Sequence, residues 1–316
     1  MTEAESRAAP GTPSAAPDDA PADKLRSGFV AVVGRPNVGK STLVNAYAGE
    51  KVAIVSPRPQ TTRRRILGIR TTEAEQAIFV DTPGVHKPRT DLGKYMVGVA
   101  RRAVPDADVV VWVVDVSRPP GDADRAIAGW IRQAGRPTVI AMNKSDLLAP
   151  ENIAAHTAAF TALAPGADWA LTIATEDHNL DLLWDLIRSS LPEGPMFYPP
   201  EQVTDQTDRM LVSELVREAA LRFLEQEVPH GVETLIEEWE TREDGVLQIG
   251  ATLIVERESH KGIVIGKGGA MIKQIGRSAR AEIERLLERH VYLDLRVKAR
   301  PGWRKRGADV RRFGYD

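Results

Sequence analysis

The 316-residue chain contains no cysteine and no long apolar run. The lack of cysteine excludes disulfides, thiolate metal sites and cysteine nucleophiles, and is compatible with a reducing cytoplasm. No apolar stretch approaches the roughly 18 residues that a membrane-spanning helix needs, and no basic-then-apolar leader is present, so we expect neither insertion nor export. Basic and acidic side chains nearly cancel, 42 against 44, so overall charge identifies no partner and local charge has to be examined.

Composition changes along the chain predict two domains, which a chain of this length can hold. Residues 1–26 are rich in Ala, Pro and Asp and lack apolar periodicity, so we predict a disordered tail. Residues 191–204 contain four prolines, which predicts a linker at 195–204. The first domain is therefore expected at 27–194 and the second at 205–316.

Apolar segments alternate with helical segments through the first domain. This alternation predicts an α/β fold with a doubly wound sheet, which binds ligands at the carboxyl ends of its strands. Strands are expected at 29–33, 66–70, 77–80, 109–114, 138–142 and 169–173. Helices are expected at 42–48, 91–103, 122–134, 151–163 and 179–190.

The first expected strand is followed by GRPNVGKS, which fits the pattern G-x-x-x-x-G-K-[ST]. A strand that leads through a glycine-rich turn into a helix directs several backbone N–H groups at one point, which favours a bound phosphate. Lys40 would then contact the β- and γ-phosphates and Ser41 would ligate magnesium. Taken alone, the motif could also be a glycine-rich turn that matches by chance. The residues assigned to nucleotide binding are Gly34, Arg35, Pro36, Asn37, Val38, Gly39, Lys40, Ser41 and Thr42.

Two further polar motifs, DTPG and NKSD, follow later strands of the first domain. In the first, the Asp81 carboxylate can hold magnesium through water and the Gly84 N–H can contact the γ-phosphate. In the second, the Asp146 carboxylate can accept hydrogen bonds from N1–H and the 2-amino group of guanine, which adenine does not offer. Either tetrapeptide alone could be an ordinary turn, but three motifs in this order, each at a strand end, favour a guanine nucleotide site. These motifs add Asp81, Thr82, Pro83, Gly84, Asn143, Lys144 and Asp146 to the expected site.

Together with QTTR at residues 60–63, these motifs resemble the translation-factor class of P-loop GTPases. The resemblance implies that Thr62 joins Ser41 and Asp81 as a magnesium ligand. It also implies that the backbone N–H of Ala174 meets guanine O6, although the serine usually found before this alanine is absent.

The residue after DTPG is Val85, where signalling GTPases place a glutamine that orients water. A valine cannot orient water by hydrogen bonding, so we expect slow intrinsic hydrolysis. The resemblance implies that potassium, held near Asn37, supplies positive charge instead, with Arg63 or Arg64 as the alternative source. The expected catalytic residues are Lys40, Asn37, Thr62 and Gly84.

The second domain opens with a predicted amphipathic helix over residues 205–227, followed by strands near 232–239 and 246–256. The predicted buried face of the helix consists of Met210, Leu211, Leu215, Leu221, Phe223 and Leu224.

A V-I-G-x-x-G motif lies within GIVIGKGGAMI, and a helix is expected from it to about Arg289. A loop of glycine and lysine lets a nucleic-acid backbone approach closely while bases lie in an adjacent apolar groove; a helix-to-helix turn is the alternative. Between Arg296 and Arg312 the chain has eight Lys or Arg against one acid, with Trp303 among them, and this density favours RNA. The candidate RNA-binding residues are Gly266, Lys267, Gly268, Gly269, Lys273 and Arg277.

The GTPase motifs, the YPPEQVTDQTDR linker, the VERESHKGIVIGKGG loop and the terminal LRVKARPGW and FGYD stretches resemble the Era family of bacterial ribosome-assembly GTPases over about residues 27–316. The resemblance implies that residues 205–316 form a type II KH domain, which is a small α+β fold. It also implies magnesium and GTP or GDP as ligands, and binding to small-subunit ribosomal RNA near its 3′ end. It further implies a role in 30S subunit assembly and maturation, a cytoplasmic monomer, and a weak peripheral association with the inner membrane face.

Three other functions fit parts of the sequence. A membrane-associated cell-cycle regulatory GTPase would use the second domain to bind protein, and crosslinking would then recover little ribosomal RNA. A tRNA-modifying GTPase would need catalytic cysteines or cofactor domains, which this sequence lacks. A GTPase domain joined to a purely structural module is the remaining alternative, and the leading interpretation is a GTP-hydrolysing switch that binds ribosomal RNA.

Overall fold

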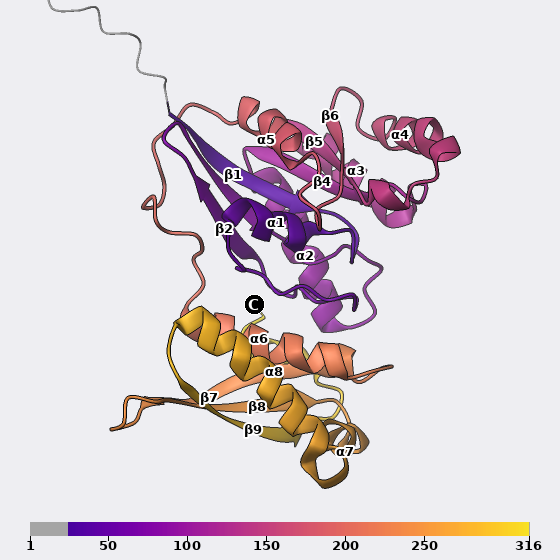
Figure 1. Cartoon of the computed structure of the whole chain (residues 1–316). Coiled ribbons are helices and arrows are strands. Elements are labelled where there is room, and N and C mark those ends of the chain that lie inside the picture. Colours follow the sequence, from indigo (N-terminus) through magenta and orange to yellow (C-terminus); the bar gives the residue numbers. More distant parts are fainter. Residues whose placement is uncertain (1–24, 316) are drawn as a thin grey trace, which may run out of the picture.

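The structure, a computed structural model, describes residues 25–315 and contains two β-sheets, each with its own helices (Figure 1). The tail predicted at residues 1–26 lies almost entirely outside the described residues. At its end the prediction is wrong, because Arg26 already begins the first strand and pairs with Glu75. None of the helices between residues 25 and 315 is long and apolar enough to cross a bilayer.

The first sheet has six strands in the order β2-β3-β1-β4-β5-β6. Their bounds are β1 Arg26–Val33, β2 Ile66–Thr71, β3 Glu75–Asp81, β4 Val109–Asp115, β5 Thr138–Asn143 and β6 Asp168–Thr172. Neighbouring strands from β3 to β6 are parallel, whereas β2 is antiparallel to β3. The predicted doubly wound α/β fold is confirmed, with β2 as an antiparallel edge strand.

Helices cover both faces of this sheet (Figure 1). They are α1 Lys40–Ala48, α2 Asp91–Asp106, α3 Asp122–Ala134, α4 Ile153–Thr161 and α5 Leu180–Ser189. On the face covered by α1 and α5, Tyr47 stacks on Phe79 at a centroid distance of 4.9 Å. On the face covered by α2, α3 and α4, Trp112 meets Phe160 edge-on at 5.9 Å. Both faces of the parallel strands are therefore buried, as their unbroken apolar sequences predict.

The second sheet has three strands in the order β7-β8-β9, with β7 antiparallel and β9 parallel to β8. The elements of this domain are α6 Asp208–Phe223, β7 Glu233–Thr241, β8 Leu247–Val255, α7 Glu258–Ile265, α8 Ala270–Leu287, β9 Val291–Ala299 and α9 Gly307–Arg312. The predicted α6, β7, β8 and α8 are confirmed, while α7, β9 and α9 were not predicted. In β9 apolar residues alternate with Tyr, Asp, Arg and Lys, a period of two that is typical of a strand with one exposed face.

The buried face of α6 differs from the prediction. Leu215, Leu221 and Leu224 are buried as predicted, but Met210 and Phe223 are only half-buried. Leu211 is also half-buried. The buried surface of α6 is wider than predicted and includes two charged side chains. The buried residues of α6 are Val212, Leu215, Val216, Arg217, Glu218, Ala219, Ala220 and Leu221. The prediction assumed one covered face, whereas α6 packs against α8 and also contacts Val55 and Thr61 of the first domain.

The segment predicted as a linker, 195–204, has no regular structure, and it lies along the edge strand β2. The backbone N–H of Ile69 donates to the Val203 carbonyl at 2.8 Å, and the Thr204 hydroxyl donates to the Leu67 carbonyl at 2.7 Å. These bonds pair backbone groups that an edge strand would otherwise expose.

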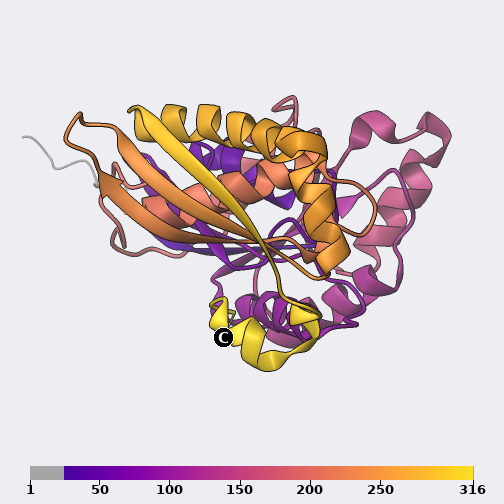
Figure 2. The same ribbon diagram turned by 90° about the horizontal axis from the view of Figure 1, so that it is seen from below.

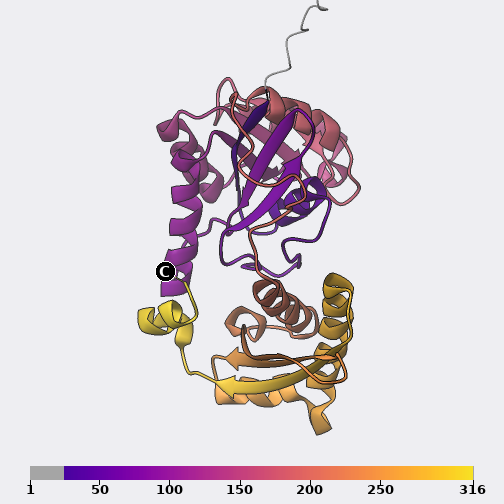
Figure 3. The ribbon, with the colours of Figure 1, turned by 90° about the vertical axis from the view of Figure 1, so that its left-hand side faces the viewer.

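Apolar side chains of the C-terminal segment join the two domains. Trp303, Phe313 and Tyr315 pack in one cluster with Leu92 and Met96 of α2. Figures 2 and 3 show the C-terminal segment, in yellow, beside the first turns of α2. The final residues of the chain are therefore part of the contact between the domains.

Trp303 is expected to stabilise this contact strongly, because its ring is fully buried and its N–H donates to the Gly231 carbonyl at 2.9 Å. We expect Trp303→Ala to lower the free energy of unfolding by about 3–5 kcal/mol. The matched control Trp169→Ala removes a ring that is 43% exposed, and it should lower the free energy of unfolding by at most about 1 kcal/mol. Denaturant unfolding of both variants measures the difference, and equal losses would contradict the role assigned to Trp303.

Candidate functional site

A pocket of about 470 Å³ lies at the carboxyl ends of the parallel strands of the first sheet. The loop at 34–41, Gly84 and the loop at 143–146 meet there, as the sequence motifs predict, and residues 54–62 close another side. The expected site residues that line the pocket are Pro36, Asn37, Gly39, Lys40, Ser41, Thr42, Thr62, Gly84, Asn143, Lys144, Asp146 and Ala174.

The other expected nucleotide residues lie behind the pocket wall. Thr82 is structural, because its hydroxyl donates to the Val32 carbonyl at 2.8 Å. The Arg35 guanidinium forms an ion pair with Asp124 at 3.1 Å. The residues of this group are Gly34, Arg35, Val38, Asp81, Thr82 and Pro83.

Asn143 connects the phosphate loop to the loop that carries Ala174. Its side-chain amide donates to the Val38 carbonyl at 2.7 Å, and its Oδ1 accepts from the Ala174 N–H at 2.9 Å. Gly39 has a φ of 105°, and a Cβ there would collide with the Asn143 amide, so only glycine fits. Asn143 is therefore a positioning residue, a role that the sequence analysis missed. The Ala174 N–H, predicted to meet guanine O6, is engaged by Asn143 in this structure.

Three oxygen-bearing side chains converge at the phosphate end of the pocket. The Ser41 hydroxyl donates to Asp81 Oδ2 at 2.6 Å and lies 2.8 Å from the Thr62 hydroxyl. The other carboxylate oxygen, Asp81 Oδ1, is buried and accepts no hydrogen bond from residues 25–315. Hydroxyl and carboxylate oxygens are the ligands that Mg²⁺ prefers. The residues expected as metal ligands thus lie together and fit magnesium.

Lys40 lies beside this group, and its ammonium donates to the Arg35 carbonyl at 2.9 Å. Burial lowers the pKa of Lys40 from 10.5 to about 8, and the Asp81 carboxylate opposes the change. Burial likewise raises the pKa of Asp81, opposed by Lys40. A bound polyanion would favour the charged form of Lys40, so the electrostatics of the loop suit a phosphate chain.

At the end of the pocket expected to bind the base, Lys144 and Ser145 hold the loop that carries Asp146. The Lys144 ammonium pairs with Asp115 at 3.0 Å, and the Ser145 hydroxyl donates to the Thr172 carbonyl at 3.2 Å. These contacts hold the loop while Asp146 stays exposed at the pocket. Its carboxylate is accordingly available to an incoming base.

Val85, Arg63 and Arg64, which were expected to affect hydrolysis, do not face the pocket. Val85 is buried in the core, and its N–H donates to the Gly34 carbonyl at 3.0 Å. Arg63 and Arg64 point away from the pocket, toward the second domain, where Arg63 binds the Val232 carbonyl at 2.7 Å. The alternative that one of these arginines supplies charge to the nucleotide is therefore wrong for this structure.

A second concave site, of about 260 Å³, lies between α8 and β9 in the second domain. Basic side chains of α8 form one wall, and β9 contributes the other. Lys273 and Arg277 were expected there, whereas the residues from β9 were missed because that strand was not predicted. The lining consists of Ile272, Lys273, Gly276, Arg277, Arg280, Tyr292, Leu293 and Leu295.

The GxxG loop, Gly266–Gly269, joins α7 to α8 immediately before this groove. Lys267 and Gly268 are exposed, and Gly268 has a φ of 58° with open space around it. The loop joins two helices, and its exposed residues leave room for a nucleic-acid backbone beside the groove, so this geometry fits both interpretations.

In the basic run near the C-terminus, Trp303, Arg300 and Arg304 are engaged within the protein. Trp303 is buried rather than available for stacking. Arg304 is paired with Glu256, and Arg300 with Asp309 at 2.5 Å. Tyr292, which is 49% exposed in the groove, is the better placed aromatic.

The fold and these sites define a P-loop GTPase domain followed by a small α+β domain with a GxxG loop. Residues 29–144 match the family model for 50S ribosome-binding GTPases, and residues 227–304 match the KH domain. The chain is 43% identical to the GTPase Era of Heliobacterium modesticaldum, over 93% of this chain and 98% of that relative. It is 42% identical to the GTPase Era of Deinococcus deserti, over 92% of this chain and 95% of that relative.

A crystal structure of Era in complex with MgGDPNP and nucleotides 1506–1542 of 16S ribosomal RNA is also similar, with a TM-score of 0.89 at 38% identity. The alignment covers 92% of this chain and 99% of that one. The chain belongs to the Era family of GTPases, and both the predicted family and the predicted KH domain are confirmed.

Guanine selection is expected to depend on Asp146. We expect Asp146→Asn to weaken GTP binding by roughly a hundredfold or more, because the bond from the 2-amino group is lost and the bond from N1–H is no longer charge-assisted. Binding of xanthosine triphosphate should strengthen, because its 2-oxo group can accept from the new amide. The control Asp122→Asn changes an exposed carboxylate at the start of α3. Equilibrium binding of both nucleotides is the measurement, and unchanged GTP affinity in Asp146→Asn would remove the assigned role.

Proposed function

We propose that this protein binds and hydrolyses GTP with magnesium, binds small-subunit ribosomal RNA near its 3′ end, and assists 30S subunit assembly and maturation. The observation that carries the proposal is the presence of both sites in one chain. The Era structure that holds MgGDPNP and a 16S ribosomal RNA segment is similar over 92% of this chain, which includes both sites. RNA sequencing after crosslinking in cells tests the proposal, with enrichment of the 16S 3′ end expected.

In the first site, Lys40 and the backbone N–H groups of the phosphate loop would hold the β- and γ-phosphates. Ser41, Thr62 and Asp81 would hold magnesium, which stabilises negative charge that develops on the phosphate oxygens. The Gly84 N–H would contact the γ-phosphate. Asp146 would select guanine at the other end of the pocket.

We further propose that the site takes a potassium ion near Asn37. The Asn37 amide donates to the Pro57 carbonyl at 2.6 Å, and both residues line the pocket. A flip of the Asn37 amide would bring its Oδ1 next to the Pro57 carbonyl oxygen, so that these two oxygens could both bind a cation. Val85 is buried and Arg63 is bound to the second domain, so neither can orient water or supply positive charge at the β–γ bridge.

GTP hydrolysis should therefore be faster in potassium than in sodium at constant ionic strength, by roughly tenfold if one strong electrostatic contact is involved. Asn37→Ala should remove the difference, because it removes the side-chain oxygen. The control Asn152→Ala, at an exposed position without a side-chain cap bond, should retain it. Steady-state rates in the two salts are the measurement. Equal rates for the parent protein would rule out the cation.

In the second site, the basic residues of α8 would contact phosphates, and the apolar side of the groove would receive bases. Tyr292 offers a stacking surface, as aromatic side chains do for single-stranded RNA. The glycines of the Gly266–Gly269 loop let the RNA backbone approach α8.

Lys267→Asp is expected to weaken RNA binding about three- to tenfold. It should also reduce the slope of log affinity against log salt concentration by about one, as for the loss of one phosphate contact. The matched control Lys94→Asp makes the same charge change at an exposed position on α2 and should change RNA binding little. RNA affinity across a salt series is measured beside the basal GTPase rate, which both variants should retain. If Lys267→Asp keeps the parent's affinity and salt slope, the loop is a structural turn.

We propose that the protein acts as a monomer in the cytoplasm, where ribosomal RNA is made, with only a weak peripheral association with the inner membrane face. Light scattering would measure the oligomeric state, and cell fractionation would measure the membrane-bound share. A predominantly membrane-bound protein with little crosslinked ribosomal RNA would favour a regulatory function instead.

A further inference from the structure

The segment between α1 and β2, residues 51–64, contacts the second domain at both of its ends. Near its start, the Lys51 ammonium pairs with Glu218 of α6 at 2.5 Å. The same carboxylate accepts from the backbone N–H of Val55 at 3.0 Å. Since residues 54–62 also close the nucleotide pocket, α6 contacts a wall of that pocket from outside.

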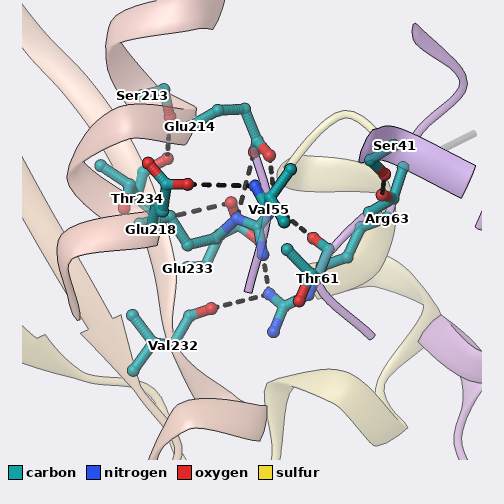
Figure 4. A network of polar contacts seen from close by, with 12 residues as sticks. Ser41, Val55, Thr61, Arg63, Ser213, Glu214, Glu218, Val232, Glu233 and Thr234 are labelled. Carbon is teal, nitrogen blue, oxygen red and sulfur yellow. Dashed lines mark hydrogen bonds and ion pairs between the residues drawn. The ribbon is translucent and has the colours of Figure 1, made fainter. Parts of the chain in front are cut away.

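The last residues of this segment are held more extensively (Figure 4). Arg217 of α6 donates to the Thr61 carbonyl at 2.5 Å. Arg63 donates to the Val232 carbonyl at 2.7 Å and forms an ion pair with Glu233 at 2.9 Å. The residues immediately before and after Thr62 are therefore both bound by the second domain.

The end of the chain completes this cluster. The Tyr315 hydroxyl donates to Glu233, and the Tyr315 ring lies 4.7 Å from the Arg64 guanidinium. Arg64 in turn donates to the Phe313 carbonyl. Glu233 thus links the C-terminal tyrosine to Arg63.

All the charged groups at the centre of this cluster are buried. Burial acts to raise the pKa of Glu233, but the guanidinium groups of Arg63 and Arg217 outweigh it and hold the pKa below its usual range. Buried ion pairs contribute little net stability compared with well-packed apolar side chains. A cluster of this kind is better explained by the geometry that it imposes, and Thr62 is the residue that it surrounds.

We propose that Arg217 and Tyr315 are positioning residues for Thr62, so that the second domain completes the magnesium site of the first. Thr62 lies between two residues whose partners are fixed, and its hydroxyl is 2.8 Å from the Ser41 hydroxyl. A segment already held in this geometry does not lose further conformational entropy when the metal binds. The inference rests on the proposed GTPase function.

The test compares Arg217→Lys and Tyr315→Phe with the parent protein. Arg217→Lys keeps the charge but loses the planar fork that reaches Thr61 and Glu214 together. Tyr315→Phe keeps the ring and removes only the hydroxyl. We expect kcat for GTP to fall roughly tenfold, as for loss of one hydrogen bond to a charged group, and the magnesium concentration for half-maximal rate to rise. GDP affinity should stay unchanged, because the phosphate loop and Asp146 bind GDP without Thr62.

The matched control is Arg304→Lys, which alters an arginine–carboxylate pair of the same domain whose partner, Glu256, lies outside the cluster around Glu233. It should leave both kcat and the magnesium dependence at the parent's values. If GDP affinity falls as much as kcat, or if the control loses as much activity, the cluster merely maintains the fold and the proposal is wrong. Tyr315→Phe alone distinguishes these outcomes even if Arg217→Lys does not fold.

A double-mutant cycle locates the effect at Thr62. Tyr315→Phe should cause no further loss of kcat in a Thr62→Ala background, whereas an independent, additive loss would overturn the proposal. If the parent protein turns over no GTP, the proposed function fails and the inference fails with it. If the parent is active and both variants keep its magnesium dependence, the inference alone fails.

Discussion

The ion pair between Arg63 and Glu233 is the contact on which the arrangement of the two domains depends. Its partners come from the end of the 51–64 segment and the start of β7, and both side chains are almost fully buried. Removing one member of such a pair leaves an unpaired buried charge, which costs about 3–5 kcal/mol. The two domains therefore pack in a position that keeps this pair closed.

The helix α6 contacts both the segment that closes the nucleotide pocket and the helix that forms the RNA groove. α6 contacts the nucleotide segment through Arg217 and Glu218, and it also packs against α8. The GxxG loop lies at the N-terminus of α8, and the basic wall of the groove is formed by the same helix. A displacement of α6 would consequently affect both the magnesium ligand Thr62 and the groove.

The parts of the site that could be predicted from the sequence are those encoded within a few consecutive residues. The phosphate loop, DTPG and NKSD each follow an apolar strand, and parallel strands necessarily bring their carboxyl ends together. β9 was missed although its alternation signals a strand, and with it Tyr292 was missed. The roles of Asn143 and Trp303 were misjudged for another reason: their partners, Val38 and Gly231, are distant in sequence. Likewise, no local pattern pairs Arg63 with Glu233, because the contact exists only once the domains are packed.

The most direct test of this account is the affinity of a 16S 3′-end RNA oligonucleotide measured with a non-hydrolysable GTP analogue and with GDP, at fixed magnesium and salt. If α6 is shared by the two sites, the affinity must differ between the two nucleotides, and the RNA must shift the preference for the analogue over GDP by the same factor. Identical RNA affinity in both nucleotide states would contradict the account, because the segment that holds Thr62 would then be independent of the groove.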